Sequence, residues 1–134
     1  MALSSNVNVD YQVGDQEAYP VAAAATIYAG AAVGEDSTGY ARPLQAGDKF
    51  LGFAIFMADN AAGAAGALRV EVRKKGNAVL PVAGSSITSN DRPAVYAIDD
   101  DTFTLTAGAN SPIGYVSRWE QGTTCIVEFD SRGI

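Results

Sequence analysis

The chain has 134 residues, 48% of them hydrophobic, which is enough for one domain built around a single core. Nine lysines and arginines against fifteen aspartates and glutamates give a formal charge of −6, which disfavours nucleic acid as a partner. The single cysteine excludes an intrachain disulfide and predicts maturation in a reducing cytoplasm. No segment approaches the ~20 apolar residues that cross a bilayer and none resembles a signal peptide, so a soluble protein without a membrane partner is expected.

Residues 1–18 are expected to form an extended N-terminal arm that precedes a domain of residues 19–134. The arm is polar apart from a weak alternation of apolar residues at odd positions, namely Val7, Val9, Tyr11 and Val13. In an extended conformation these side chains share one edge, which could be laid against a neighbour as an added strand. A frayed terminus is the alternative.

Three segments follow in the first half of the domain. Residues 27–33 predict two small strands or one strand bent at Gly30. Residues 50–56 are nearly all apolar, as expected for a core strand covered on both faces. The Gly- and Ala-rich residues 59–67 predict a loop, because each glycine inside a helix costs about 1 kcal/mol relative to alanine.

Residues 68–73 alternate apolar and charged side chains, which predicts a strand with one dry and one wet face. The alternation places Arg69, Arg73 and Lys75 on the wet face with Glu71. These cations belong to the only basic cluster of the chain and could dock on an acidic protein surface, although a solvated sheet face is the ordinary interpretation.

The Gly76-Asn77 pair predicts a tight hairpin between this strand and residues 78–82. Pro81 cannot donate a ladder hydrogen bond, so the second strand is expected to lie at an edge or to end there.

The second half of the chain continues in short strands and turns. After a polar loop at 85–91, residues 93–98 and 103–106 predict a hairpin across an acidic turn, and Gln121-Gly122 turns the chain into a last strand at 124–129. Eight or nine short strands without a long helix predict an all-β, single-domain small barrel or sandwich.

Side chains that could carry catalysis are scarce. The sequence has no histidine, which excludes Ser-His-Asp and Cys-His arrangements. Cys125 lies in an alternating strand and is expected to be a core or half-buried thiol. Asp99-Asp100-Asp101 lacks the spacing of a known calcium loop and is better explained as a solvated turn. We therefore expect no catalytic residue, metal or cofactor, and no enzyme.

Trp119 lies beside Arg118, next to the turn at Gln121-Gly122. Trp and Arg are enriched at binding hot spots, so this pair could anchor an interface. Trp119 could equally cap the end of the barrel core.

Five short motifs follow one another along the chain: ATIYAG at 25–30, LGFA at 51–54, LRVEVRK at 68–74, PAVY at 93–96 before an acidic turn, and PIGYV at 112–116. In this order and spacing the chain resembles, over about residues 19–129, the small capsid cement or head decoration proteins of tailed bacteriophages.

The resemblance implies a non-enzymatic virion protein that is made in the bacterial host cytoplasm. Such a protein binds the outer surface of the assembled major capsid protein shell as a homotrimer or homodimer and stabilises it. The arm and the Trp119 edge would carry the contact.

The second hypothesis is a carbohydrate- or receptor-binding β module on a virion surface, which should expose several aromatic side chains in one groove. It ranks lower because the tyrosines are scattered among different segments, at Tyr11, Tyr19, Tyr28 and Tyr40.

Overall fold

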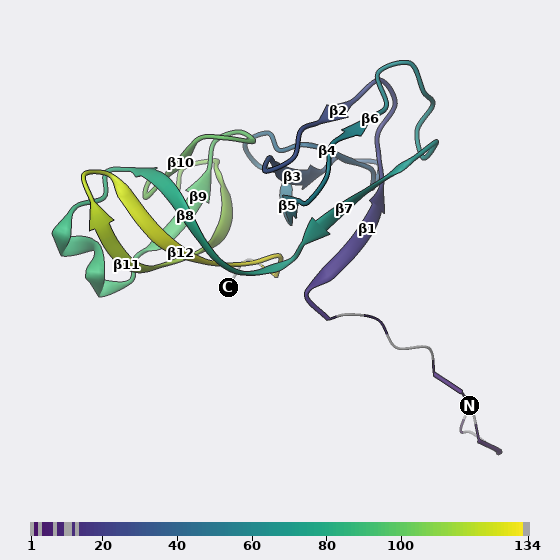
Figure 1. Cartoon of the computed structure of the whole chain (residues 1–134), viewed down its shortest axis with the longest axis horizontal. Coiled ribbons are helices and arrows are strands. Elements are labelled where there is room, and N and C mark those ends of the chain that lie inside the picture. The colour runs from purple at the N-terminus through teal and green to yellow at the C-terminus, as the bar shows by residue number, and fades with distance from the viewer. Residues whose placement is uncertain (1, 3, 7, 10–11, 13, 133–134) are drawn as a thin grey trace.

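The computed structural model describes residues 2, 4–6, 8–9, 12 and 14–132. This part of the chain forms twelve strands and one short 3-10 helix, so the predicted all-β class is confirmed, with more strands than the eight or nine expected. Figure 1 shows two lobes side by side, one holding β1 to β7 and the other β8 to β12. The first lobe is an open sheet and the second is a closed barrel, so the barrel is the one of the two expected architectures that is present.

The first lobe is an antiparallel five-stranded sheet with a separate two-stranded sheet beside it. In spatial order the five-stranded sheet contains β1 (Gln16–Pro20), β7 (Arg69–Arg73), β5 (Lys49–Ala54), β3 (Ala32–Glu35) and β4 (Ala41–Pro43). The two-stranded sheet pairs β2 (Thr26–Ile27) with β6 (Ala58–Asp59). β2 and β3 are the two strands expected around Gly30, whose φ of 86° suits a turn. β1 also takes in residues 16–18, which were expected in the arm.

The second lobe is a closed five-stranded barrel. In spatial order it contains β10 (Phe103–Thr104), β8 (Lys75–Ala83), β12 (Thr124–Asp130), β11 (Ser111–Gln121) and β9 (Ala94–Ala97). The predicted polar loop at 85–91 contains the 3-10 helix η1 (Ile87–Asp91). The hairpins expected between β9 and β10 and between β11 and β12 are both present.

β5 lies between two hydrophobic clusters. Phe50 packs into the barrel cluster with Val82, Val116 and Phe129, whereas Leu51 packs into a second cluster behind the sheet. That second cluster also contains Val33, Val70 and Val72. The expectation of a strand covered on both faces is therefore confirmed for residues 50–54.

The same prediction is wrong at its C-terminal end. β5 ends at Ala54, and the side chain of Phe56 is 63% exposed. The chain leaves the sheet here because β6, which follows, pairs with β2 instead of continuing β5.

The hairpin expected at Gly76-Asn77 is not formed. β7 and β8 join at Lys74 into one continuous extended strand, which we call the ribbon, and its neighbouring strand changes at this residue. The Lys74 N–H donates to the Asp15 carbonyl at 2.7 Å, and the Lys74 carbonyl accepts from the Ser131 N–H at 2.7 Å. β1 thus pairs with the first part of the ribbon and β12 with the second. This single ribbon connects the two lobes (Figure 1).

Pro81 lies inside β8, which continues to Ala83, so the strand does not end there. On the side away from β12, no described strand pairs with β8 between Lys75 and Pro81. The predicted edge position of Pro81 is therefore confirmed.

Candidate functional site

The arm residues picked out from the sequence are only partly described. Val7, Tyr11 and Val13 lie outside the described residues. Val9 is described and its side chain is exposed.

The basic residues of the 68–75 segment divide between two strands. Arg69, Glu71 and Arg73 are exposed on one face of β7, as the alternation predicts. Lys75 is the exposed first residue of β8, so it continues the alternation of β7 beyond the change of partners at Lys74. The sheet pairing of β7 stops at Arg73, where β5 and β1 both end their registers.

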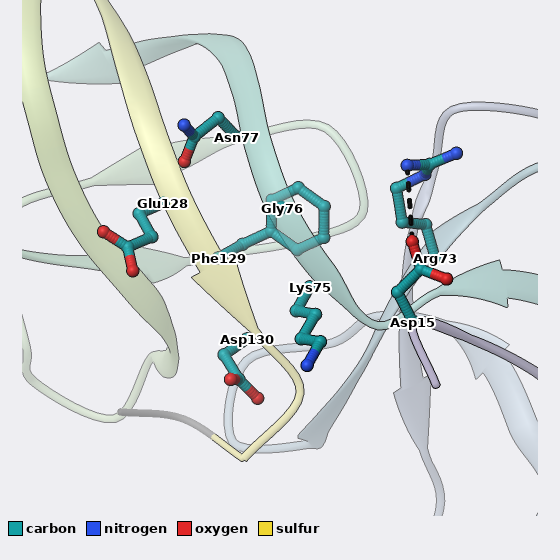
Figure 2. A pocket seen from close by; sticks show the side chains of 8 residues that line it. All are labelled: Asp15, Arg73, Lys75, Gly76, Asn77, Glu128, Phe129 and Asp130. Atoms are coloured by element: carbon teal, nitrogen blue, oxygen red, sulfur yellow. Dashed lines mark ion pairs between the residues drawn. The ribbon is translucent and has the colours of Figure 1, made fainter. Parts of the chain in front are cut away.

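A hollow of about 560 Å³ opens beside this junction, lined mainly by polar side chains (Figure 2). Its charged residues are Arg73, Lys75, Asp15, Glu128 and Asp130. Arg73 Nη1 lies 3.8 Å from Asp15 Oδ2, and both side chains are substantially exposed. Three carboxylates against two cations leave no positive surface here, which supports the interpretation of a solvated sheet face.

Trp119 is held at the far end of the barrel by two hydrogen bonds. Its backbone N–H donates to Asn90 Oδ1 at 2.8 Å, and its indole Nε1–H donates to the Gly122 carbonyl at 2.9 Å. The ring packs partly against the barrel cluster. Trp119 thus closes the end of the core, as one of its two interpretations predicts, and part of the residue remains exposed.

Exposed side chains flank this tryptophan in the sequence of β11, and another lies on η1, which is bonded to β11. Ile87 of η1 is 65% exposed, and Arg118 extends into solvent 3.9 Å from Glu120. We call Ile87, Arg118, Trp119 and Glu120 the barrel rim. η1 is tied to β11 through Asn90, whose Nδ2 also donates to the Ile87 carbonyl at 3.2 Å, so hydrogen bonds hold the backbone of the rim at Ile87 and Trp119.

A second hollow, of about 520 Å³, lies next to the acidic turn between β9 and β10. It is lined by Tyr28, Asp100 and Asp101 together with the small residues 29–31. Burial, and then the charges of Asp99 and Asp101, raise the pKa of Asp100. Hydrogen bonds from the Asp101 backbone and then from Thr102 lower the pKa of Asp99. The turn is therefore internally hydrogen-bonded, as expected of a solvated acidic turn.

The structure also exposes three large apolar side chains, beside the end of β2 and the start of β6, that the sequence did not indicate. β2 and β6 pair Ile27 with Ala58; Tyr28 directly follows this pair in one strand and Met57 directly precedes it in the other. Tyr28, Phe56 and Met57 are all strongly exposed. The one available signal was that Phe56 and Met57 directly follow a core strand.

Cys125 is fully buried in the barrel cluster, as predicted. Within the described residues, no group of three or more His, Cys, Asp or Glu side chains is arranged to hold a metal ion. None of the described helices has the length and apolar character needed to span a membrane.

Comparison of the chain with protein-family models, with curated proteins and with solved structures found no match.

Proposed function

We propose that this chain is a structural virion protein that binds the outer surface of an assembled tailed-phage capsid shell and stabilises it without catalysis. The proposal rests on the order of the five sequence motifs. The barrel rim is the observation in the structure that best supports it.

The rim has the features of a docking surface. It combines a partly exposed tryptophan, an exposed isoleucine and an arginine, and Trp and Arg are the residues most enriched at hot spots. Its backbone is fixed by the hydrogen bonds of Asn90, so docking would order little that is not already ordered. A preorganised, partly apolar rim suits a protein that must fit a rigid lattice.

Symmetric association would add to the contact of each copy. Once one copy of an oligomer is seated, the next binds at high effective concentration, so modest contacts combine into tight attachment. The net charge of −6 suits an outer position, because it keeps the protein away from packaged DNA.

The direct test is binding of the purified protein to undecorated heads. We expect saturable binding and a higher melting temperature of the shell. Ile87→Asp and Arg118→Glu should each weaken binding by about tenfold, the order of one hot-spot contact. Phe56→Ser, an equally exposed position in the other lobe, is the matched control and should bind normally. Absence of saturable binding by the wild-type protein would refute the proposal.

A carbohydrate- or receptor-binding module is the second candidate, and the hollow beside Tyr28 favours it. An exposed tyrosine facing two aspartates offers an aromatic face and hydrogen-bond acceptors together. If this function holds, a glycan array gives specific hits that Tyr28→Ala abolishes, whereas Ile87→Asp leaves them intact. An array without hits leaves the capsid proposal as the better one.

A further inference from the structure

One of the two edges of the β7–β8 ribbon has a stretch without a paired strand. On one side it pairs with β1 and then with β12. On the other it pairs with β5 at Val72 and Arg73, and next with β10 only at Val82 and Ala83. Between these, from Lys75 to Pro81, no described strand is its partner.

The hydrogen-bond parity shows which backbone groups face this gap. In an antiparallel pair, alternate residues bond to the neighbouring strand and those between point away. The Val82 N–H donates to the Thr123 carbonyl, and the Lys74 carbonyl accepts from Ser131, so even-numbered residues of β8 bond toward β12. Asn77 and Val79 therefore present their N–H and C=O groups to the gap.

An apolar cleft of about 350 Å³ lies along this edge. Phe53, Ile55, Ala78, Leu80 and Phe129 supply its apolar lining. Phe53 and Phe129 are in edge-to-face contact, with ring centroids 4.8 Å apart. Figure 2 shows Phe129 beside Gly76, at the start of the edge. An open strand edge beside an apolar cleft is the arrangement that accepts an added strand.

We propose that the arm of a second copy of this chain, residues 7–13, adds to the Asn77–Pro81 edge as a strand. Val7, Val9, Tyr11 and Val13 alternate with polar residues, so in an extended arm they share one face that can enter the cleft. The arm has no lysine or proline, the residues that usually prevent pairing at strand edges.

The position of β1 indicates a second copy and not the arm's own chain. Asp15, the residue before β1, is bonded to Lys74 on the side of the ribbon that β1 and β12 share. The gap opens on the opposite side. The arm of the same chain would have to cross over the ribbon, whereas the arm of a neighbour can approach the edge directly, and exchange of identical elements is a low-cost route to a closed oligomer.

This inference rests on the proposed function only for the expectation that copies meet as a symmetric oligomer. It assigns the arm to contacts between copies and leaves the barrel rim for the shell.

Val79→Pro tests the edge in the full-length chain. Val79 is 61% exposed and its N–H points into the gap, so proline removes a donor that β12 does not use. Pro81 already occupies a position of the same parity. We expect wild type and Val79→Ala to be oligomers by analytical ultracentrifugation, and Val79→Pro to be a monomer with an unchanged circular dichroism spectrum. A monomeric wild type, or an oligomeric Val79→Pro variant, overturns the inference.

Crosslinking identifies the chain that supplies the arm. Val9→Cys protein is mixed with Val79→Cys protein and treated with a short bismaleimide, while buried Cys125 stays unreactive. We expect covalent heterodimers. As a control, Asn77→Pro is added to the Val79→Cys protein, where it removes another N–H that faces the gap, and the heterodimers should then be lost. Crosslinks that form only within a Val9→Cys/Val79→Cys double variant would show that the arm binds its own chain and would overturn the inference.

Head binding separates the two proposals. If copies associate by another route while heads are still bound and stabilised, only the arm exchange fails. If arms exchange as expected but undecorated heads are not bound, only the capsid function fails.

Discussion

Gly52 lies where β5 comes closest to the junction of β7 and β8. Its φ is 136°, and a Cβ placed there would meet the carbonyl oxygen of Arg73. Gly39 also has a positive φ, of 92°, but open space around it. Alanine at position 39 thus tests backbone strain alone, whereas alanine at position 52 adds a clash with backbone.

We therefore predict that Gly52→Ala lowers the free energy of unfolding by clearly more than Gly39→Ala. Strain of a non-glycine residue in this region costs about 1–3 kcal/mol, and at position 52 the clash adds to it. Urea denaturation of both variants measures the difference. Equal losses would mean that the ribbon can move away from β5 at no cost.

Asp36 closes the turn before β4 by accepting three hydrogen bonds on one oxygen. They come from the Thr38 hydroxyl at 2.6 Å, the Thr38 N–H at 2.8 Å and the Tyr40 N–H at 3.0 Å. The Thr38 hydroxyl contributes most to lowering the pKa of Asp36, followed by the Tyr40 backbone. The folded pKa lies below the unfolded value, so the stabilisation is full above the unfolded pKa and is lost as the pH falls through the folded pKa.

Replacing Asp36 by alanine should accordingly lower the melting temperature at pH 7, and the gap to wild type should narrow below about pH 4, near the ordinary pKa of aspartate. Thermal unfolding followed by circular dichroism at pH 7, 5 and 3 measures this gap. Asp36→Asn, which keeps an acceptor oxygen but loses the charge, is the control. The difference in melting temperature between Asp36→Asn and Asp36→Ala should change little with pH, because neither variant titrates at position 36. A gap that stays constant down to pH 3 would contradict the assignment.

At the scale of elements, hairpins with local signals could be predicted and the central ribbon could not. The β9–β10 and β11–β12 hairpins each join neighbouring segments across an acidic or Gln-Gly turn, so short-range sequence was sufficient. At Gly76-Asn77 the same rule failed. The inward-facing apolar residues of 68–72 and those of 78–82 all fall at even positions. The two alternations therefore keep one register across Lys74 and Gly76, which is the signal of one continuous strand.

Contacts between distant segments explain the rest of what sequence missed. Nothing local indicates that β12 takes over from β1 at Lys74, or that β2 pairs with β6 and exposes Phe56. In the candidate site, Trp119 could be predicted from its residue type alone. Ile87 belongs to the barrel rim only because η1 is bonded to β11, which the sequence does not indicate. A rim assembled by tertiary contacts has no short sequence motif.

The attachment of η1 to β11 depends on the Asn90 side chain. Asn90→Ala removes the acceptor of the Trp119 N–H, and we expect a loss of about 1 kcal/mol together with greater quenching of Trp119 fluorescence by acrylamide. Asn90→Asp keeps an acceptor oxygen and should retain the wild-type quenching. Unchanged quenching in the alanine variant would show that the rim is held by other contacts.

Across the whole molecule, two hydrophobic clusters are connected by shared strands. β5 contributes Phe50 to one cluster and Leu51 to the other, and the β7–β8 ribbon runs through both lobes. This connection couples the packing of the two lobes, because hydrogen-bonded strands run from the barrel to the sheet. It also implies that neither lobe can lose its packing without disturbing β5.

Cooperative unfolding follows from this connection, and the single tryptophan of the chain reports it. Trp119 lies in the barrel lobe, whereas Leu51, 5% exposed, packs in the cluster of the other lobe. Leu51→Ala should cost about 2–5 kcal/mol. If the lobes unfold together, the urea midpoint read by Trp119 fluorescence shifts as far as the midpoint read by circular dichroism. Val79→Ala, on the exposed outer face of β8, should move neither. A Trp119 midpoint that stays in place while circular dichroism becomes biphasic would mean that the sheet and the barrel unfold independently, and that β5 does not couple their stabilities.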